Sequence, residues 1–420
     1  MSKSGQSSAP GNLLIAGGGT GGHVFPAVAV AREWLSRGGV QGSNQERNVV
    51  IVGTGRGLEA KLVPQAGLPL ETIRVAGLKG IGGAKLLRNL ALLPASLWDS
   101  ERILGRHKFS AAFGVGGYAS GPMMLLAAMH GVPSVVFEPN VEPGFTNRVL
   151  ARMATRIAVA HPETAGKFGR KAVVTGCPIR SEFFRIPPKE RAKPFCILVT
   201  GGSRGAAPIN RAVIASLDAL GARKDELFIV HQTGERDYNE VRTAYAQREF
   251  PAEVVPFIEN MAERFAQADL IVCRSGAITV AEVSAAGRAA IFVPFGASTD
   301  AHQTRNAEAM QNAGAGRLLA QDQLTPARLT AEIFLFLDDP QRLADMETRA
   351  RALARPRAVE DIVDVLEGLV FGGLSPASPV AVQGGSSQSN EGGPGSSSAD
   401  AMQSREARVK VPSSEMGHGA

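Results

Sequence analysis

Cysteine is scarce in this chain of 420 residues, which contains only Cys177, Cys196 and Cys273. An odd number of widely separated cysteines predicts neither a disulfide framework nor a zinc site. Such sparse use of cysteine fits a protein of the reducing cytoplasm. The N-terminal stretch MSKSGQSSAPG lacks the apolar core of a signal peptide, so the sequence gives no reason to expect export.

Aromatic residues are also few, at 5% of the chain, and the excess of basic residues is mild, with 45 Lys and Arg against 39 Asp and Glu. Proteins that bind single-stranded nucleic acid use aromatic side chains on which bases stack, beside a basic groove. The composition therefore predicts no nucleic-acid partner. Glycine is abundant, with 48 residues, as in a globular protein with many loops.

Long uninterrupted hydrophobic runs are missing as well. The stretch 111–137 contains no Asp, Glu, Lys or Arg, and its length alone would suit a membrane-spanning helix. However, glycine and proline interrupt it at 116–117, 121–122 and 131–133. These breaks predict a strand, a loop, a short helix and a second strand of a buried parallel sheet.

Short apolar segments alternate along the chain with segments of helical length, which predicts parallel α/β sheets with crossover helices. A stretch rich in proline at 176–194 has the texture of a linker and divides the segments into two series. The predicted fold class is therefore α/β, with two Rossmann-like doubly wound domains. The predicted strands are 12–17, 48–53, 111–115, 133–137, 156–160 and 171–175 before the linker, and 195–200, 226–230, 252–257, 270–273, 289–295 and 316–320 after it.

The last segments of the chain differ sharply in composition. After Pro356, apolar residues recur at helical spacing and predict a final helix with one face against a core. Residues 374–420 are rich in Ser, Gly and Pro and lack aromatic residues and isoleucine. Such a segment buries too little apolar surface to offset its chain entropy, so we expect a disordered tail.

Both series begin with a strand that runs directly into a glycine-rich loop. The first loop matches GxGxxG through Gly17, Gly19 and Gly22, which suggests a dinucleotide site. That interpretation is disfavoured because the tip of the second strand, VGTG at 52–55, lacks the acidic residue that would bind the ribose. The second loop, GGSRG at 201–205, repeats the arrangement. Two such loops, each before a helix, predict an anion-binding cleft between the domains.

His23 follows the first glycine loop, and the helix is expected to begin near Val24. A lone histidine is usually a helix cap or a packed core residue. At a loop tip that faces the crevice of an open α/β sheet, however, the near-neutral pKa of an ordinary histidine makes this residue a candidate general base.

Three further motifs join these loops: VGGYASGP at 115–122, TGCPIR at 175–180 and the long stretch 257–310. Together with GGTGGHVFP at 18–26, they resemble the MurG family, bacterial N-acetylglucosaminyltransferases that convert lipid I to lipid II in peptidoglycan synthesis. The resemblance covers about residues 12–370. It implies a glycosyltransferase-B architecture, in which two Rossmann-like domains face a cleft.

The resemblance also implies how the chain is divided. Residues 12–178 would form an acceptor domain that faces the membrane, and residues 179–356 would form the domain that binds the UDP-sugar. The helix at 357–372 would return to the first domain and give its apolar face a place to pack.

A set of residues that bind the donor, UDP-N-acetylglucosamine, follows from the resemblance. They are Ile258, whose backbone would meet the uracil, Glu282 at the ribose, Arg180 and Ser203 at the pyrophosphate, His302 and Gln303 at the sugar, and Thr20, Gly21, Gly22 and Asn140. Glu282 also has a case of its own, because it follows the strand LIVC at the carboxyl end of the second sheet. A carboxylate there can accept from two vicinal hydroxyls, whereas the ordinary alternative is a solvated carboxylate on a helix surface.

Around the acceptor and the reacting carbon, the family pattern implicates His23, Tyr118, Glu138 and Asn140. The reaction implied is a single inverting displacement, in which the C4 hydroxyl of lipid-linked N-acetylmuramic acid attacks the anomeric carbon and UDP departs. Either His23 or Glu138 would be the general base, and His23 is preferred. The family's usual His-Glu-Gln-Asn run reads FEPN at 137–140, which changes two neighbours of the retained Glu and Asn.

No cofactor is expected. Sugar transferases that use a metal typically place an Asp-x-Asp triplet beside the diphosphate, and the chain contains none. Backbone N–H groups and Arg180 would stabilise the leaving diphosphate instead. Two other functions share parts of this pattern: a UDP-N-acetylglucosamine epimerase, which would release free sugar, and a non-catalytic module that binds a nucleotide-sugar or a membrane.

The segment 71–108 predicts an anionic membrane surface as a partner. It contains seven Lys or Arg against three acidic residues, and apolar residues such as Leu78, Ile81 and Trp98 lie among them. Because the undecaprenyl chain of lipid I cannot leave the bilayer, we expect a peripheral protein on the cytoplasmic side of the inner membrane. The alternative is that the leucines within 86–93 form an ordinary core stripe, which their helical spacing allows.

Overall fold

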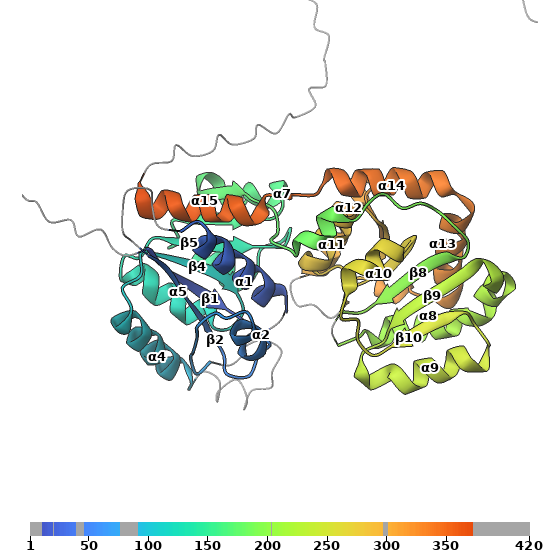
Figure 1. The fold of residues 1–420 in the computed structure, drawn as a ribbon, viewed down its shortest axis with the longest axis horizontal. Helices are drawn as coiled ribbons and strands as arrows, with labels where there is room; N and C mark the ends of the chain where they lie inside the picture. The colour runs from blue at the N-terminus through green and yellow to red at the C-terminus, as the bar shows by residue number, and fades with distance from the viewer. Residues whose placement is uncertain are drawn as a thin grey trace, which may run out of the picture. The chain divides into compact units, whose positions relative to one another are not determined.

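The structure is a computed structural model that describes residues 11–19, 21–38, 46–75, 91–202, 204–296 and 301–372. These residues belong to one compact unit and form two β-sheets flanked by helices (Figure 1). The predicted fold class, α/β with two Rossmann-like domains, is confirmed. The expected disordered tail lies outside the described residues, and the domain boundaries at 178/179 and 356/357 remain predictions.

The first sheet has seven parallel strands in the order β3-β2-β1-β4-β5-β6-β7. Its central strands are continuous apolar runs because both faces are covered; Leu13, Leu14 and Ile15 are fully buried. The sequence does not predict the short strand β3, since three residues carry little periodic signal. The strands are β1 (Gly11–Gly17), β2 (Arg47–Gly53), β3 (Leu70–Thr72), β4 (Ala111–Gly116), β5 (Ser134–Glu138), β6 (Arg156–Val159) and β7 (Ala172–Val174).

The second sheet has six parallel strands in the order β10-β9-β8-β11-β12-β13. Its strands are β8 (Phe195–Thr200), β9 (Leu227–Gln232), β10 (Ala252–Val255), β11 (Leu270–Cys273), β12 (Ala289–Phe292) and β13 (Arg317–Leu318). The strands predicted at 289–295 and 316–320 are shorter in the structure, because β12 and β13 pair at only two positions, Ile291 with Arg317 and Phe292 with Leu318.

Helices connect the strands of both sheets. The helices among the strands of the first sheet are α1 (Gly21–Ser36), α2 (Glu59–Gln65), α4 (Leu93–Arg106), α5 (Ser120–Met129), α6 (Phe145–Leu150) and α7 (Pro162–Ala165). The helices among and after the strands of the second sheet are α8 (Ala207–Leu220), α9 (Tyr238–Gln247), α10 (Met261–Gln267), α11 (Ala277–Ala286), α12 (His302–Asn312), α13 (Pro326–Asp338) and α14 (Pro340–Ala352). Short 3-10 turns are η1 (Gly169–Lys171), η2 (Ser181–Arg185), η3 (Gly221–Glu226), η4 (Glu235–Asp237) and η5 (Gln321–Gln323).

Both sheets share one winding pattern. In each, the first strand of the series lies centrally, the next two extend the sheet to one side, and the fourth strand starts the other side. The direction of winding therefore reverses between β1 and β4 and again between β8 and β11. In open α/β sheets, ligands bind at such switch points, beyond the carboxyl ends of the strands.

The last helix, α15 (Ala358–Phe371), packs against α1 and reaches β4 and β5 of the first sheet. Two arginines of the first half hold it: Arg37 pairs with Asp364 at 2.6 Å, and Arg47 pairs with Glu367 at 2.7 Å. The ring of Phe371 stacks on Trp34 with centroids 6.1 Å apart. Of the helices in the described ranges, none has both the length and the apolar character needed to cross a bilayer.

Candidate active site

The two glycine-rich turns of the first switch point lie in contact. Gly117 follows β4 with a φ of +83°, and a Cβ atom there would lie 2.3 Å from the carbonyl oxygen of Gly18, which follows β1. Only a residue without a side chain allows this approach. The ends of β1 and β4 are therefore held together where the fold predicts a ligand.

His23 lies at this junction, in the first turn of α1. The helix begins at Gly21, so Gly21 and Gly22 are helical and the start is earlier than the expected Val24; Thr20 lies outside the described residues. The ring atom Nδ1 is 3.1 Å from the carbonyl oxygen of Gly18. Because a carbonyl oxygen only accepts, Nδ1 carries the proton and the basic lone pair is on Nε2.

The surroundings of His23 suit a neutral base. Burial lowers the pKa of His23, although the hydrogen bond to Gly18 and the charge of Glu59 act in the opposite direction. The ring is therefore uncharged at neutral pH. A Cβ atom at Gly116 would lie 3.1 Å from Nε2, so the lack of a side chain there lets the ring pack closely against the end of β4.

Glu138, the other candidate base, ends β5 and is buried. Its carboxylate accepts hydrogen bonds from the backbone N–H groups of Asn140 and Gly144, each at 2.9 Å, and from the side-chain amides of Asn140 at 3.0 Å and Asn147 at 2.9 Å. Four donors thus fold the turn 138–147 around the carboxylate. Because all four bonds hold the turn in place, Glu138 has a structural role, and His23 is the better candidate for the base.

Asn306 connects this turn to the second half of the chain. Its Oδ1 accepts from the N–H of Val141 at 3.0 Å, and its Nδ2 donates to Oδ1 of Asn140 and to the carbonyl oxygen of Ser275, both at 3.1 Å. Sequence reasoning missed this residue. The clue in the sequence is that Asn306 lies one helical turn after His302 and Gln303, on the same face of α12.

The predicted sugar-binding pair at the start of α12 also makes polar contacts. His302 Nδ1 lies 2.8 Å from the carbonyl oxygen of Glu142, in the turn of the first half. Gln303 accepts from the N–H of Phe295 through Oε1 at 3.0 Å, and its backbone carbonyl accepts from Ser275 Oγ at 2.8 Å. These bonds fix the entry to α12 against the carboxyl ends of β11 and β12.

Arg274 supports the same strand ends, and sequence reasoning assigned it no role. It is buried, and its Nη1 donates to the carbonyl oxygens of Val293 and Pro294 at 3.0 and 2.9 Å. Its guanidinium lies 5.4 Å from the ring centroid of Phe295. The arginine therefore ties the turn after β11 to the exit of β12.

Two residues predicted to bind different parts of the donor form an ion pair. Arg180 Nη2 lies 3.2 Å from Oε1 of Glu282, which is on α11. Burial raises the pKa of Glu282 to about 7, although the charge of Arg180 acts to lower it. The guanidinium also lies 4.9 Å from the ring centroid of Phe183 and 5.6 Å from that of Phe25. The structure thus brings Arg180 and Glu282 together beside α1.

The remaining predicted residues are placed as follows. Ile258 lies between β10 and α10 with its side chain in the core, so only its backbone is available to a ligand. Tyr118 follows Gly117 and is 55% exposed. Ser203 lies outside the described residues.

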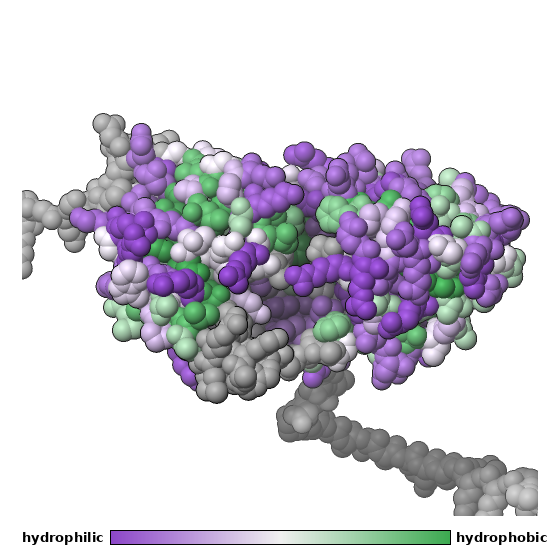
Figure 2. Space-filling view, turned by 90° about the horizontal axis from the view of Figure 1, so that it is seen from below, coloured by the Kyte–Doolittle hydropathy of each residue, from purple (hydrophilic) through white to green (hydrophobic). Residues whose placement is uncertain are grey.

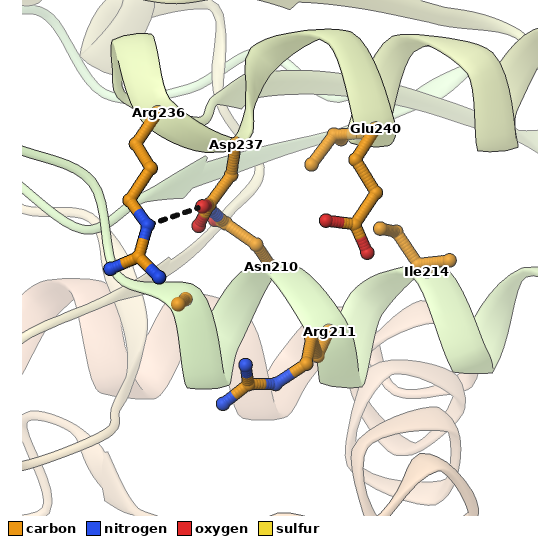
Figure 3. A pocket seen from close by; sticks show the side chains of 8 residues that line it. Asn210, Arg211, Ile214, Arg236, Asp237 and Glu240 are labelled. Carbon is orange, nitrogen blue, oxygen red and sulfur yellow. Dashed lines mark hydrogen bonds and ion pairs between the residues drawn. The ribbon is translucent and has the colours of Figure 1, made fainter.

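A pocket of about 190 Å³ lies elsewhere in the second half, between α8 and the segment of η4 and α9 (Figure 3). Arg211 and Arg236 line it together with Asp237 and Glu240, and Arg236 pairs with Asp237 at 3.8 Å. The charges balance, and none of the predicted site residues lies in its wall. No cluster of three metal-binding side chains occurs in the described part of the chain.

Two family models match the chain. The glycosyltransferase family 28 N-terminal domain matches residues 13–159, and the glycosyltransferase family 28 C-terminal domain matches residues 196–362. The first range runs from within β1 to the end of β6, and the second runs from within β8 into α15.

Relatives resemble the chain over nearly their whole length. The "UDP-N-acetylglucosamine--N-acetylmuramyl-(pentapeptide) pyrophosphoryl-undecaprenol N-acetylglucosamine transferase" of Myxococcus xanthus is 43% identical over 361 residues, which are 85% of this chain and 93% of the relative. The protein of the same name from Solibacter usitatus is 44% identical over 357 residues, 85% of this chain and 95% of the relative.

Solved structures show the same architecture. MurG of Acinetobacter baumannii is similar with a TM-score of 0.69 and 34% identity, covering 85% of this chain and 99% of that one. A UDP-N-acetylglucosamine 2-epimerase is similar with a TM-score of 0.64 but only 11% identity, covering 88% and 98%. The second likeness concerns the fold alone.

Proposed function

Because the chain belongs to glycosyltransferase family 28, and within it to the MurG-type N-acetylglucosaminyltransferases, we propose that it converts lipid I to lipid II in peptidoglycan synthesis. It transfers N-acetylglucosamine from UDP-N-acetylglucosamine to the C4 hydroxyl of undecaprenyl-pyrophosphoryl-N-acetylmuramyl-pentapeptide. The observation that carries the proposal is the identity of 43–44% over 93–95% of the length of relatives named for this transfer.

His23 is the general base of this reaction. Nε2 takes the proton of the C4 hydroxyl while the hydroxyl oxygen forms a bond to the anomeric carbon, and the bond from that carbon to the diphosphate breaks. UDP leaves with the electron pair, and the new linkage is β-1,4. The neutral ring, its fixed tautomer and its position at the β1/β4 switch point support this role.

Arg180 and Glu282 bind the donor by exchanging partners. The ribose hydroxyls donate to the carboxylate of Glu282, and the guanidinium of Arg180 turns to the diphosphate, where it stabilises the developing charge. Nε of Arg180 is buried with no hydrogen-bond partner among the described residues, so one donor is already available for a phosphate oxygen. Ile258, Ser203, His302 and Gln303, with the first glycine loop and Asn140, complete the donor site, and Tyr118 borders the acceptor.

The first half carries the membrane-facing surface. Trp98 on α4 is 60% exposed, with the guanidinium groups of Arg74 and Arg102 at 5.9 and 6.0 Å from its ring, and Met129 on α5 is 68% exposed. The two helices pack against each other, and Figure 2 shows apolar surface among polar residues on this half. Exposed apolar side chains beside arginines suit anionic lipid headgroups. Residues 76–90, which include Leu78 and Ile81, lie outside the described residues.

Incubation with labelled UDP-N-acetylglucosamine and lipid I tests the proposal. Label that moves into the lipid fraction, with release of UDP, is the expected result. Release of free sugar without lipid labelling would indicate an epimerase, and binding without turnover would indicate a non-catalytic module. Either of these two outcomes contradicts the proposal.

A further inference from the structure

Glu59, at the start of α2, is a buried carboxylate that has no role in the reaction proposed above. It is 1% exposed. Its Oε2 accepts from the backbone N–H of Gly19 at 2.7 Å, and its Oε1 accepts from the N–H of Thr54 at 2.9 Å and from Thr54 Oγ1 at 2.7 Å. These donors are neutral, so the charge is stabilised by hydrogen bonds alone.

The space that Glu59 occupies is formed by three glycines. A Cβ atom would lie 2.5 Å from Oε1 at Gly18, 2.7 Å from Cγ at Gly53 and 2.0 Å from Oε2 at Gly57. Any side chain at these positions would displace the carboxylate. Burial acts to raise the pKa of Glu59, but the hydrogen bonds from Thr54 and Gly19 outweigh it and hold the pKa below its usual value. The group is therefore ionised at neutral pH.

One peptide group joins this carboxylate to His23. The N–H of Gly19 donates to Glu59 Oε2 at 2.7 Å, and the carbonyl of the same peptide, that of Gly18, accepts from Nδ1 of His23 at 3.1 Å. Resonance couples the two ends of a peptide group. A negative charge at the N–H end therefore increases the negative charge on the carbonyl oxygen, as in other chains of hydrogen bonds in a protein interior.

We propose that Glu59 is a positioning residue for the general base and acts on His23 through the Gly18–Gly19 peptide. The inference rests on the proposed function, in which His23 takes the proton of the acceptor hydroxyl. Glu59 keeps the proton of the neutral ring on Nδ1, so that Nε2 faces the reacting hydroxyl. It also stabilises the imidazolium that forms when the proton arrives, because its charge raises the pKa of His23. A carboxylate bonded directly to a histidine has this effect in hydrolase triads; here a peptide group lies between them.

The principal test is Glu59→Gln, which keeps the shape of the side chain and removes its charge. We expect kcat to fall by about tenfold or more, a part of the 10²–10⁴ that general-base catalysis contributes, with the KM for UDP-N-acetylglucosamine changed by less than about twofold. The acid limb of the kcat profile should move to lower pH, because His23 loses the charge that raises its pKa. A higher KM with unchanged kcat would instead assign Glu59 to the shape of the donor loop and overturn the proposal.

The matched control is Glu226→Gln. Glu226 pairs with Arg223 at 2.7 Å in η3, at the amino end of β9 in the second half, so this variant also removes a carboxylate charge but away from the site. Its kcat and pH profile should equal those of the parent. A double-mutant cycle with His23→Ala adds a second readout: Glu59→Gln should have no further effect on kcat when His23 is absent, and additive losses contradict the mechanism.

A measurement on the unmodified full-length protein keeps the inference testable if Glu59→Gln does not fold. With glycine labelled with ¹⁵N and histidine with ¹³C, the amide signal of Gly19 should titrate with the midpoint of His23. A Gly19 signal that does not change over the His23 titration overturns the proposal. This readout is independent of turnover, so full activity of His23→Ala would refute the base assignment while the coupling is still measured directly.

Discussion

The two halves of the protein share a fold but place different chemistry on it. Each winds its strands in the same order from a central first strand, and each continues that strand into a glycine-rich loop. In the first half, the switch point holds a neutral histidine and a buried carboxylate, His23 and Glu59. In the second, the helix after β11 carries Glu282, paired with Arg180. The repeated fold supplies the location, and in the proposed reaction a few side chains separate proton transfer in one half from donor binding in the other.

The surfaces of the halves differ as well. Of the thirteen large hydrophobic residues that are exposed in the described part of the chain, nine lie in the first half and four in the second. A soluble donor needs no apolar surface, whereas an acceptor anchored by an undecaprenyl chain requires contact with the bilayer. The asymmetry therefore agrees with the proposed division between acceptor and donor halves.

The largest expected effect is that of His23→Ala. Loss of the proposed general base should lower kcat by about 10²–10⁴-fold, while the affinity for UDP measured by calorimetry stays the same because Glu282 and Arg180, proposed to bind the ribose and the diphosphate, are unchanged. His418→Ala, which removes a histidine outside both family-model matches, is the control. If His23→Ala retains more than a tenth of the parent's kcat, the first half does not supply the base in this way.

Glu282→Ala should weaken donor binding, which His23→Ala should leave unchanged. A hydrogen bond to a charged group contributes about 1.5–3 kcal/mol, so calorimetry should show UDP affinity at least about tenfold lower. Glu308→Ala, which removes a carboxylate that pairs with Arg305 at 2.7 Å on α12, is a control. Unchanged UDP affinity in a folded Glu282→Ala variant would remove this residue from the donor site.

The pH dependence of donor binding should follow Glu282. Burial raises the pKa of Glu282 to about 7, so the carboxylate is charged above that pH and becomes protonated as the pH falls through it. The charged form is the stronger acceptor for the ribose hydroxyls. UDP affinity should therefore decline below about pH 7, and the Glu282-dependent part of the decline should vanish in Glu282→Gln. Identical pH profiles for the variant and the parent contradict this assignment.

The smallest effect on UDP binding is expected from changes to the proposed membrane-facing surface. Replacing Leu78, Lys79, Ile81 and Lys85 together by Ser or Gln should reduce sedimentation with anionic vesicles and activity on lipid I in bilayers. UDP binding should stay as in the parent, because the second half is untouched. Adding Trp98→Ser should reduce sedimentation further. Equal sedimentation of the parent and the multiple variant would place the membrane contact elsewhere.

Much of the fold was predictable because its signals are local. Continuous apolar runs that end in glycine loops mark β1 and β8, and helical spacing after Pro356 marks α15. The three-residue strand β3 carries too little pattern to be recognised. His23 and Glu282 could be proposed because each lies on the helix that follows a strand end, where an α/β sheet places its ligands.

The sequence by itself determined the α/β class, the two series of strands and the family, since periodicity, loop chemistry and ordered motifs are properties of the chain alone. Only the tertiary structure decided that Glu138 accepts four hydrogen bonds, that Asn306 joins the halves and that Glu59 reaches His23 through one peptide. Glu59 and Gly19 are 40 positions apart, and Asn306 and Val141 are 165 apart. Hydrogen bonds depend on distances of about 3 Å and on direction, and sequence spacing over such separations specifies neither.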